Sequence, residues 1–205
     1  MGHYIKYNKN YWDRKIFDEN SKFDTEILKH QSVGINKSQN LFKKYVELVC
    51  LEMSYYCNRA CSYCPVAIYE RSDKNLEIDN ELFLSIINSL KKIDYAGRIS
   101  LNLFNEPLAS KNFLERVKKL NNNLPKAILS CNSNGDYVKN PETFAKLDES
   151  GLKEILITLH PAKNTSWTKS YAQKSIKRFA KKISHPLSDV ELEKLKFSFM
   201  VNKLY

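Results

Sequence analysis

From Val46 onward, strand-like and helical patterns alternate regularly along the chain, and this alternation restricts the possible folds. Apolar runs typical of strands occur at residues 46–54, 98–104, 127–132, 154–160 and 196–202. Segments with helical periodicity lie between successive runs and are long enough to cross a sheet. Repeated strand–helix–strand units form parallel sheets with right-handed crossovers. The sequence therefore predicts an α/β fold.

Local signals predict where the helices begin and end. Asp79 is expected to cap a helix whose apolar face is formed by Leu82, Ile86, Leu90 and Ile93. Ser110 is expected to cap a second helix, on which the apolar residues are Phe113, Leu114, Val117 and Leu120. Asn140-Pro141 should start a third helix and Gly151 should end it.

The predicted strands alternate polar with apolar residues. Ser100 and Asn102 alternate with Ile99 and Leu101, and the same pattern occurs in three other strands at Ser130, Asn132, Thr158, His160, Ser198 and Asn202. A parallel sheet that is covered on both faces would be apolar on both. We therefore expect helices on one face and a ligand-lined concavity on the other, as in an open barrel. The alternative is an ordinary α/β sheet with polar residues at its strand ends.

Three cysteines lie together in the segment Cys57-Asn-Arg-Ala-Cys61-Ser-Tyr-Cys64. The segment follows the first strand, at the carboxyl end where parallel α/β barrels bind ligands. Three thiols so close in sequence do not all satisfy disulfide geometry with one another. The polar start, Met1–Trp12, lacks a signal-peptide core, and no run reaches the roughly 18 apolar residues of a membrane span. We expect a cytoplasmic protein with no membrane association, where such a cluster binds metal.

The number of thiols indicates which metal they bind. A structural zinc site needs four ligands, and Cys50 and Cys131 lie within predicted strands, where cysteine is often a small buried apolar residue. Three thiolates suit a [4Fe–4S] cluster with one iron left for another ligand. Zinc and an unligated cysteine group remain as alternatives.

The positive charge is concentrated near the end of the chain. The net charge is +10, and residues 161–205 carry 10 basic and 3 acidic side chains. A helix is expected at about residues 170–183, with one basic stripe formed by Lys174, Lys177, Arg178, Lys181 and Lys182. The stripe favours a solvated helix face, and docking of an acidic redox protein or RNA is the alternative. Nucleic acid is possible but not favoured.

The motifs resemble those of the radical S-adenosylmethionine (radical SAM) superfamily. The Cys57-x3-Cys61-x2-Cys64 loop, with Tyr63 before its last cysteine, resembles the signature of that family. Asn105-Glu106-Pro107 resembles its Gly-Glu-Pro motif, residues 132–135 resemble its Thr-Asn-Gly, and residues 156–160 resemble its fourth strand. The resemblance implies a partial (β/α) barrel of about five to six parallel strands with outer helices, at residues 46–205. Residues 1–45 are expected to form an N-terminal extension.

The resemblance also implies a chemistry. Cys57, Cys61 and Cys64 would hold a [4Fe–4S] cluster, whose open iron would bind S-adenosyl-L-methionine (SAM). Reduction by a flavodoxin- or ferredoxin-type donor would cleave SAM to a 5′-deoxyadenosyl radical, which takes hydrogen from an unknown substrate, a peptide or a small molecule.

Cofactor contacts are implied for individual residues. Asn105 and Glu106 would accept hydrogen bonds from the methionyl ammonium, with Pro107 stiffening the strand end. The backbone of Tyr63 would meet the adenine. The remaining cofactor contacts are assigned to Ser130, Asn132, Asn134 and Thr158. His160 and Glu52 are candidates for a catalytic role on the substrate side.

Two departures from the family pattern leave alternatives open. Asn105 stands where the family usually has glycine, and the chain ends just after the expected fifth strand, so that the core domain is predicted to be incomplete at its C-terminal end. One alternative is a cluster-binding protein that is catalytically incompetent or needs a partner chain to complete the barrel. A second is a basic nucleic-acid-binding protein with structural zinc.

Overall fold

The structure is a computed structural model that describes residues 34–61, 64, 71, 73, 75–160, 168–185 and 188. The chain divides into two compact units, one formed by residues 47–196 and the other by residues 1–46 and 197–205. In the second of these units the described segment is helix α3, Ile35–Tyr45, in which no residue is buried. The predicted strand at residues 196–202 lies outside the described residues.

The larger unit contains a parallel sheet of β1 (Leu48–Cys50), β2 (Arg98–Ser100), β3 (Ile128–Ser133) and β4 (Glu154–Ile157), in the order β1-β2-β3-β4. Every neighbouring pair is parallel, which confirms the predicted α/β class. Most strands are shorter than predicted. The second ends at Ser100, and beyond it Asn132 N donates to the side-chain Oδ1 of Asn102, at 2.6 Å, in place of a backbone carbonyl of the neighbouring strand.

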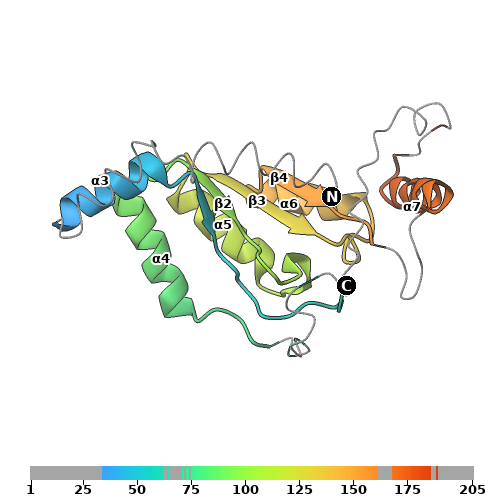
Figure 1. Cartoon of the computed structure of the whole chain (residues 1–205), viewed down its shortest axis with the longest axis horizontal. Helices are drawn as coiled ribbons and strands as arrows, with labels where there is room; N and C mark the ends of the chain where they lie inside the picture. Colours follow the sequence, from blue (N-terminus) through green and yellow to red (C-terminus); the bar gives the residue numbers. More distant parts are fainter. Residues whose placement is uncertain are drawn as a thin grey trace, which may run out of the picture. The chain divides into compact units, whose positions relative to one another are not determined.

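Three helices cover one face of this sheet: α4 (Asn80–Lys92), α5 (Phe113–Asn123) and α6 (Pro141–Ser150) (Figure 1). Their buried side chains share one apolar core with the inward strand residues, among them Ile99, Leu101 and Leu129. A short 3-10 helix, η1 (Pro107–Ala109), lies between β2 and α5, and α7 (Lys169–Lys182) follows β4. The α helices after β1, β2 and β3 are therefore the predicted crossovers.

The buried faces of α4 and α5 agree only in part with those predicted, since Leu90 on α4 and Phe113, Val117 and Leu120 on α5 are buried as expected. On α4 the buried residues are Phe83, Ile87 and Leu90, whereas Leu82 is 53% exposed. Phe83 and Ile87 take the core positions predicted for Leu82 and Ile86, while Ile86 and Ile93 are partly buried beside them. Leu114 on α5 is likewise exposed.

The predicted cap at Ser110 is also wrong. Ser110 ends η1, and α5 begins at Phe113 after Asn112. In contrast, Pro141 starts α6 as predicted, and Gly151 ends it with φ +92°, a left-handed conformation that glycine adopts without strain.

The other face of the sheet carries the predicted polar residues Ser100, Ser130 and Asn132, but also apolar residues that are exposed in the described structure. Leu48, Ile128 and Leu156 on this face are 48%, 40% and 62% exposed. Across it Arg98 pairs with Glu154 through two hydrogen bonds of 2.6 and 3.0 Å. None of the described helices has the length and apolar composition needed to cross a membrane.

The Asp79 cap provides a test of the local fold. Its carboxylate accepts hydrogen bonds from Glu81 N at 2.8 Å and Leu82 N at 3.0 Å, as predicted for an N-cap. We expect Asp79→Ala to lower the free energy of unfolding by about 1 kcal/mol, because two helix amides lose their acceptor. Asp79→Ser keeps an acceptor and should lose far less, as measured by urea denaturation. Equal losses in the two variants would show that the cap does not contribute.

Candidate functional site

The cysteine loop leaves the carboxyl end of β1 and is connected to α4 through residues 65–78. Cys57, Cys61 and Cys64 are half-buried, and each has a free thiol. Backbone bonds run from Cys64 N to Cys61 O, at 2.8 Å, and from Cys57 N to Arg71 O, at 3.4 Å. Among the residues that the structure describes, no three His, Cys, Asp or Glu side chains enclose a single metal ion. A cubane cluster is larger than one ion and holds its cysteine sulfurs farther apart.

The surroundings of Cys57 shift the pKa of its thiol in opposite directions. Burial raises its pKa most, the backbone N–H of Arg59 lowers it through a hydrogen bond, and Glu106, Cys61 and Cys64 raise it further. The net pKa lies above the ordinary value. Ligation of iron requires the thiolate, so that metal binding would release this proton.

The return of the loop toward α4 is fixed by Arg71. Its guanidinium donates to Glu52 Oε1 at 2.9 Å and also to the backbone carbonyl of Tyr55, and it lies over the Tyr55 ring at 4.4 Å. Glu52 Oε1 accepts a further bond from Phe104 N, at 3.0 Å. Glu52, a catalytic candidate from the sequence, thus joins the ends of β1 and β2 to the loop.

The middle of the loop is attached to the segment after β3. Arg59 Nε and Nη2 donate to the two carboxylate oxygens of Asp136, each at 2.7 Å, and Asn58 Nδ2 donates to Asp136 Oδ2, also at 2.7 Å. Burial would raise the pKa of Asp136, but the hydrogen bonds from Arg59 and Asn58 outweigh burial and the pKa is lowered. Asp136 is therefore a carboxylate at neutral pH.

Glu106 lies beneath the site with 2% of its surface exposed. Its carboxylate accepts bonds from Ser133 Oγ at 2.7 Å, Asn134 N at 2.8 Å and Leu108 N at 3.2 Å. Burial raises its pKa more than these bonds lower it. Pro107, which is buried, begins η1 directly after it.

Asn105 has an acceptor that no group among the described residues uses. Its Nδ2 donates to Ser54 Oγ at 3.0 Å, whereas its buried Oδ1 has no hydrogen-bond partner in the described structure. An unpaired buried acceptor costs stability unless a ligand supplies the donor. The donor-only ammonium of SAM is a group of that kind.

The other predicted cofactor residues occupy different positions. Ser130 is nearly buried within β3, and its Oγ donates to Ile99 O at 3.5 Å, whereas Asn132 and Thr158 are exposed. The side chain of Asn134 is used within the protein: its Nδ2 donates to Asn58 Oδ1, and its Oδ1 accepts from Asp136 N. Tyr63 lies outside the described residues.

The second catalytic candidate, His160, lies beside the cysteines, with Nδ1 3.8 Å from Cys61 Sγ. Burial lowers its pKa most, Arg59 lowers it further, and Asp136 raises it. The structure thus brings His160 to the cysteine loop from the end of the fourth predicted strand.

Sequence reasoning missed the residues that hold the loop in place, above all Arg59, Arg71 and Asp136. Two sequence features could have indicated the contact between Arg59 and Asp136. One is an arginine between two clustered cysteines, and the other is an aspartate directly after Asn134-Gly135. Tyr137, next to Asp136, was also missed. Burial and a hydrogen bond with Tyr56 raise the pKa of Tyr137 to about 12.

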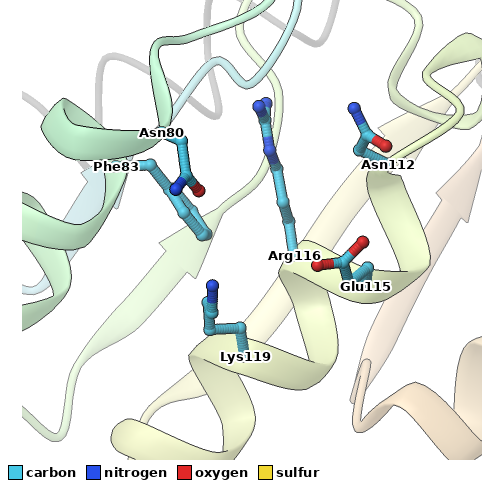
Figure 2. A pocket seen from close by; sticks show the side chains of 6 residues that line it. All are labelled: Asn80, Phe83, Asn112, Glu115, Arg116 and Lys119. Carbon is cyan, nitrogen blue, oxygen red and sulfur yellow. The ribbon is translucent and has the colours of Figure 1, made fainter.

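A cavity of about 360 Å³ lies between α4 and α5, and its lining contains no cysteine (Figure 2). Its lining residues are Asn80, Phe83, Asn112, Glu115, Arg116 and Lys119. Arg116 donates to Met53 O at 2.8 Å and to Ile78 O at 2.9 Å, and it pairs with Glu77 at 3.3 Å. These contacts give Arg116 a structural role, in which it joins α5 to the segments before α4.

The chain is similar to known proteins. The 2-deoxy-scyllo-inosamine dehydrogenase of Niallia circulans, an S-adenosyl-L-methionine-dependent protein, is 31% identical over 117 residues, which are 57% of this chain and 46% of that protein. BtrN in complex with AdoMet and 2-DOIA matches with a TM-score of 0.53 and 26% identity, over 72% of this chain and 54% of BtrN. BtrN in an open conformation matches with a TM-score of 0.51 and 29% identity, over 57% of this chain and 51% of BtrN.

This chain spans about half the length of these relatives. The family model described as the radical SAM superfamily matches residues 51–185, well over half of the chain. The match contains the cysteine loop, the Asn105-Glu106-Pro107 segment and the sheet from β2 to β4. The chain therefore belongs to the radical SAM superfamily of enzymes.

Proposed function

We propose that this chain carries the catalytic core of a radical SAM enzyme, with Cys57, Cys61 and Cys64 as the ligands of a [4Fe–4S] cluster. The observation that supports the proposal most directly is the cysteine loop itself, which lies at the carboxyl end of β1 with free, half-buried thiols. The chemistry that such a cluster supplies when bound is one-electron cleavage of SAM, which yields a radical that takes hydrogen from a substrate.

The neighbouring residues fit the amino acid part of SAM. The unpaired Oδ1 of Asn105 gives a buried acceptor for the ammonium, and Glu106 places a carboxylate next to it in sequence. Three internal donors hold the Glu106 carboxylate in one orientation, so that its negative field is fixed before SAM arrives. Asn132 and Thr158 are exposed, and nearly buried Ser130 lies beside Asn132 on the same side of β3; we place the ribose and carboxylate of SAM at these residues. We place the adenine at the backbone of Tyr63.

The relatives indicate a class of substrate. A protein that matches this chain is a dehydrogenase of 2-deoxy-scyllo-inosamine, a small hydroxylated amine. We propose a small hydroxylated molecule as the substrate, in preference to a peptide. His160, beside Cys61, is the candidate to accept a proton from such a substrate.

The basic face of α7 suits an acidic electron donor of the flavodoxin or ferredoxin type. Its exposed cationic residues are Lys174, Lys177, Arg178, Lys181 and Lys182. On the same helix, Phe179 lies near the loop after β3, because a Cβ on Gly135 would be 3.2 Å from Phe179 Cε2. That loop also carries Asp136, which binds the cysteine loop. The basic residues lie on the side of α7 opposite Phe179, so that a donor docked there would be one helix away from that loop.

The cluster assignment is tested by iron content and SAM cleavage. After anaerobic reconstitution, we expect about four iron atoms per chain and 5′-deoxyadenosine formation with dithionite and SAM. Cys57→Ala should lose both. Cys50→Ala is the matched control, because Cys50 is exposed within β1 and should leave both unchanged. Equal iron content in the two variants would remove Cys57 from the ligand set.

The role of Asn105 is tested by SAM affinity. Asn105→Leu removes the buried acceptor and should raise the Kd for SAM about tenfold or more, because a hydrogen bond to a charged group is lost. Asn105→Asp retains an acceptor and should bind SAM more tightly than Asn105→Leu. Calorimetry on the iron-loaded variants measures both, with Asn123→Leu on α5 as control. An unchanged Kd in Asn105→Leu would place the ammonium elsewhere.

The donor surface is tested by charge reversal on α7. Lys174→Glu/Lys181→Glu should slow reduction by an acidic flavodoxin about fivefold or more and weaken its salt dependence, because electrostatic steering is lost. Reduction by dithionite should not change. The control, Lys92→Glu/Lys118→Glu, alters the net charge equally on α4 and α5. Equal slowing in both variants would show a general charge effect and no docking site on α7.

A further inference from the structure

A closed network of polar side chains joins the cysteine loop to the loop after β3. Arg59 and Asp136 form a two-pronged ion pair, with both N···O distances at 2.7 Å. Asn58 donates to the same carboxylate, and Asn134 Nδ2 donates to Asn58 Oδ1 at 2.8 Å. Asn134 Oδ1 then accepts from Asp136 N, at 2.9 Å. The contacts of Asp136 with Arg59 and Asn58 thus join residues that are separated by 77 and 78 positions in the sequence.

The loop that carries Asp136 is itself held firmly. Asn134 N donates to buried Glu106, and Gly135 N donates to Ser133 Oγ at 3.0 Å. Gly135 has φ +75°, and a Cβ there would lie 2.8 Å from Ile157 Cγ2. The position therefore requires glycine. Asp136 consequently offers Arg59 a carboxylate in a fixed place.

The ion pair lies among the residues expected to meet the cluster. Arg59 stands between Cys57 and Cys61 in sequence, and its backbone N–H bonds to the Cys57 thiol. Both Arg59 and Asp136 act electrostatically on His160, which is 3.8 Å from Cys61 Sγ. The pair is thus close to two of the three ligands.

We propose that Arg59 and Asp136 are a positioning pair, which holds the segment from Cys57 to Cys61 in its cluster-binding shape before iron arrives and presents no net charge to the cluster. The proposal rests on the proposed function, because it takes the cysteines as cluster ligands. A loop without regular secondary structure would otherwise have to be ordered when iron binds, and prior order increases affinity.

The residue types suit this role. The planar guanidinium of arginine matches a carboxylate at two points and fixes direction as well as distance, which the single ammonium of lysine does not. The side chains of Arg59 and Asp136 are 27% and 34% exposed. Conservative substitutions at this partly exposed site should leave the apolar core intact.

The first test is the rate at which iron-loaded protein loses iron to a chelator without oxygen. We expect Arg59→Lys and Asp136→Asn to lose iron about tenfold faster than the wild type, as is typical when partners of metal ligands are removed. The double variant should be no faster than the single ones, because the two residues act as one unit. Wild-type rates in both single variants, or effects that multiply in the double variant, would overturn the proposal.

The structure supplies a matched control in the second two-pronged pair, Arg98 with Glu154. It has the same chemistry, with distances of 2.6 and 3.0 Å, but joins β2 to β4 at residues far in sequence from the cysteines. Arg98→Lys should release iron at the wild-type rate. Equal acceleration in Arg98→Lys would mean that any lost ion pair loosens the protein, and the specific role of Arg59 would be refuted.

The second test is the midpoint potential of the cluster, which responds to nearby charge. Asp136→Asn leaves the arginine cation beside the cysteines and should raise the potential. Arg59→Gln leaves the carboxylate and should lower it. Loosening of the loop alone would not give shifts of opposite sign, so that shifts of the same sign would contradict the neutral pair.

The third test uses iron-free protein and is independent of cluster binding. Hydrogen–deuterium exchange of a peptide that contains residues 57–61 should be slow in the wild type and in Arg98→Lys, and faster in Arg59→Lys. Equal uptake in the wild type and Arg59→Lys would refute prior order in the loop. If the wild type took up no iron, the proposed function would fail, while the exchange result would still decide the role of the pair.

Discussion

The buried carboxylate of Glu106 connects the parts from which the site is built. It accepts hydrogen bonds from the backbone of η1 and from two residues at the end of β3, while its own N–H donates to Tyr56 O at 3.0 Å, one residue before Cys57. Three chain segments therefore meet at a single residue, through its carboxylate and its backbone N–H. A carboxylate suits this position because it accepts several bonds at once, whereas a neutral amide would bring a donor against backbone donors.

Around this centre, charged side chains replace regular secondary structure. Glu52 with Arg71 holds the return of the cysteine loop, and Arg59 with Asp136 holds its middle. The sheet and its helices supply a rigid base, and the carboxyl ends of parallel strands bring the loops to one edge. The unpaired Oδ1 of Asn105 is the one described buried side-chain atom in this arrangement that lacks a partner, as expected where a ligand completes the bonding.

The sequence predicted the parallel α/β sheet and the cysteine loop because these depend on local patterns. Alternating periodicity, Asp79, Pro141 and Gly151 act over a few residues, and three close cysteines are evident without a structure. The buried stripe of α4 was misplaced because Leu82 and Phe83 are both apolar, and only packing decides which one faces the core. The Arg59–Asp136 pair was not predicted because 77 residues separate its members, and charged residues in loops are usually solvated.

Cys131 differs from the loop cysteines in its burial and therefore in its chemical reactivity. It is 1% exposed under the helices, and burial raises its pKa to about 12. Oxidants and alkylating reagents attack accessible thiolates, so this sulfur is chemically inert in the native protein. Oxidation will therefore reach exposed Cys50 and the half-buried loop thiols first, and it will leave the interior packing around Cys131 unaltered.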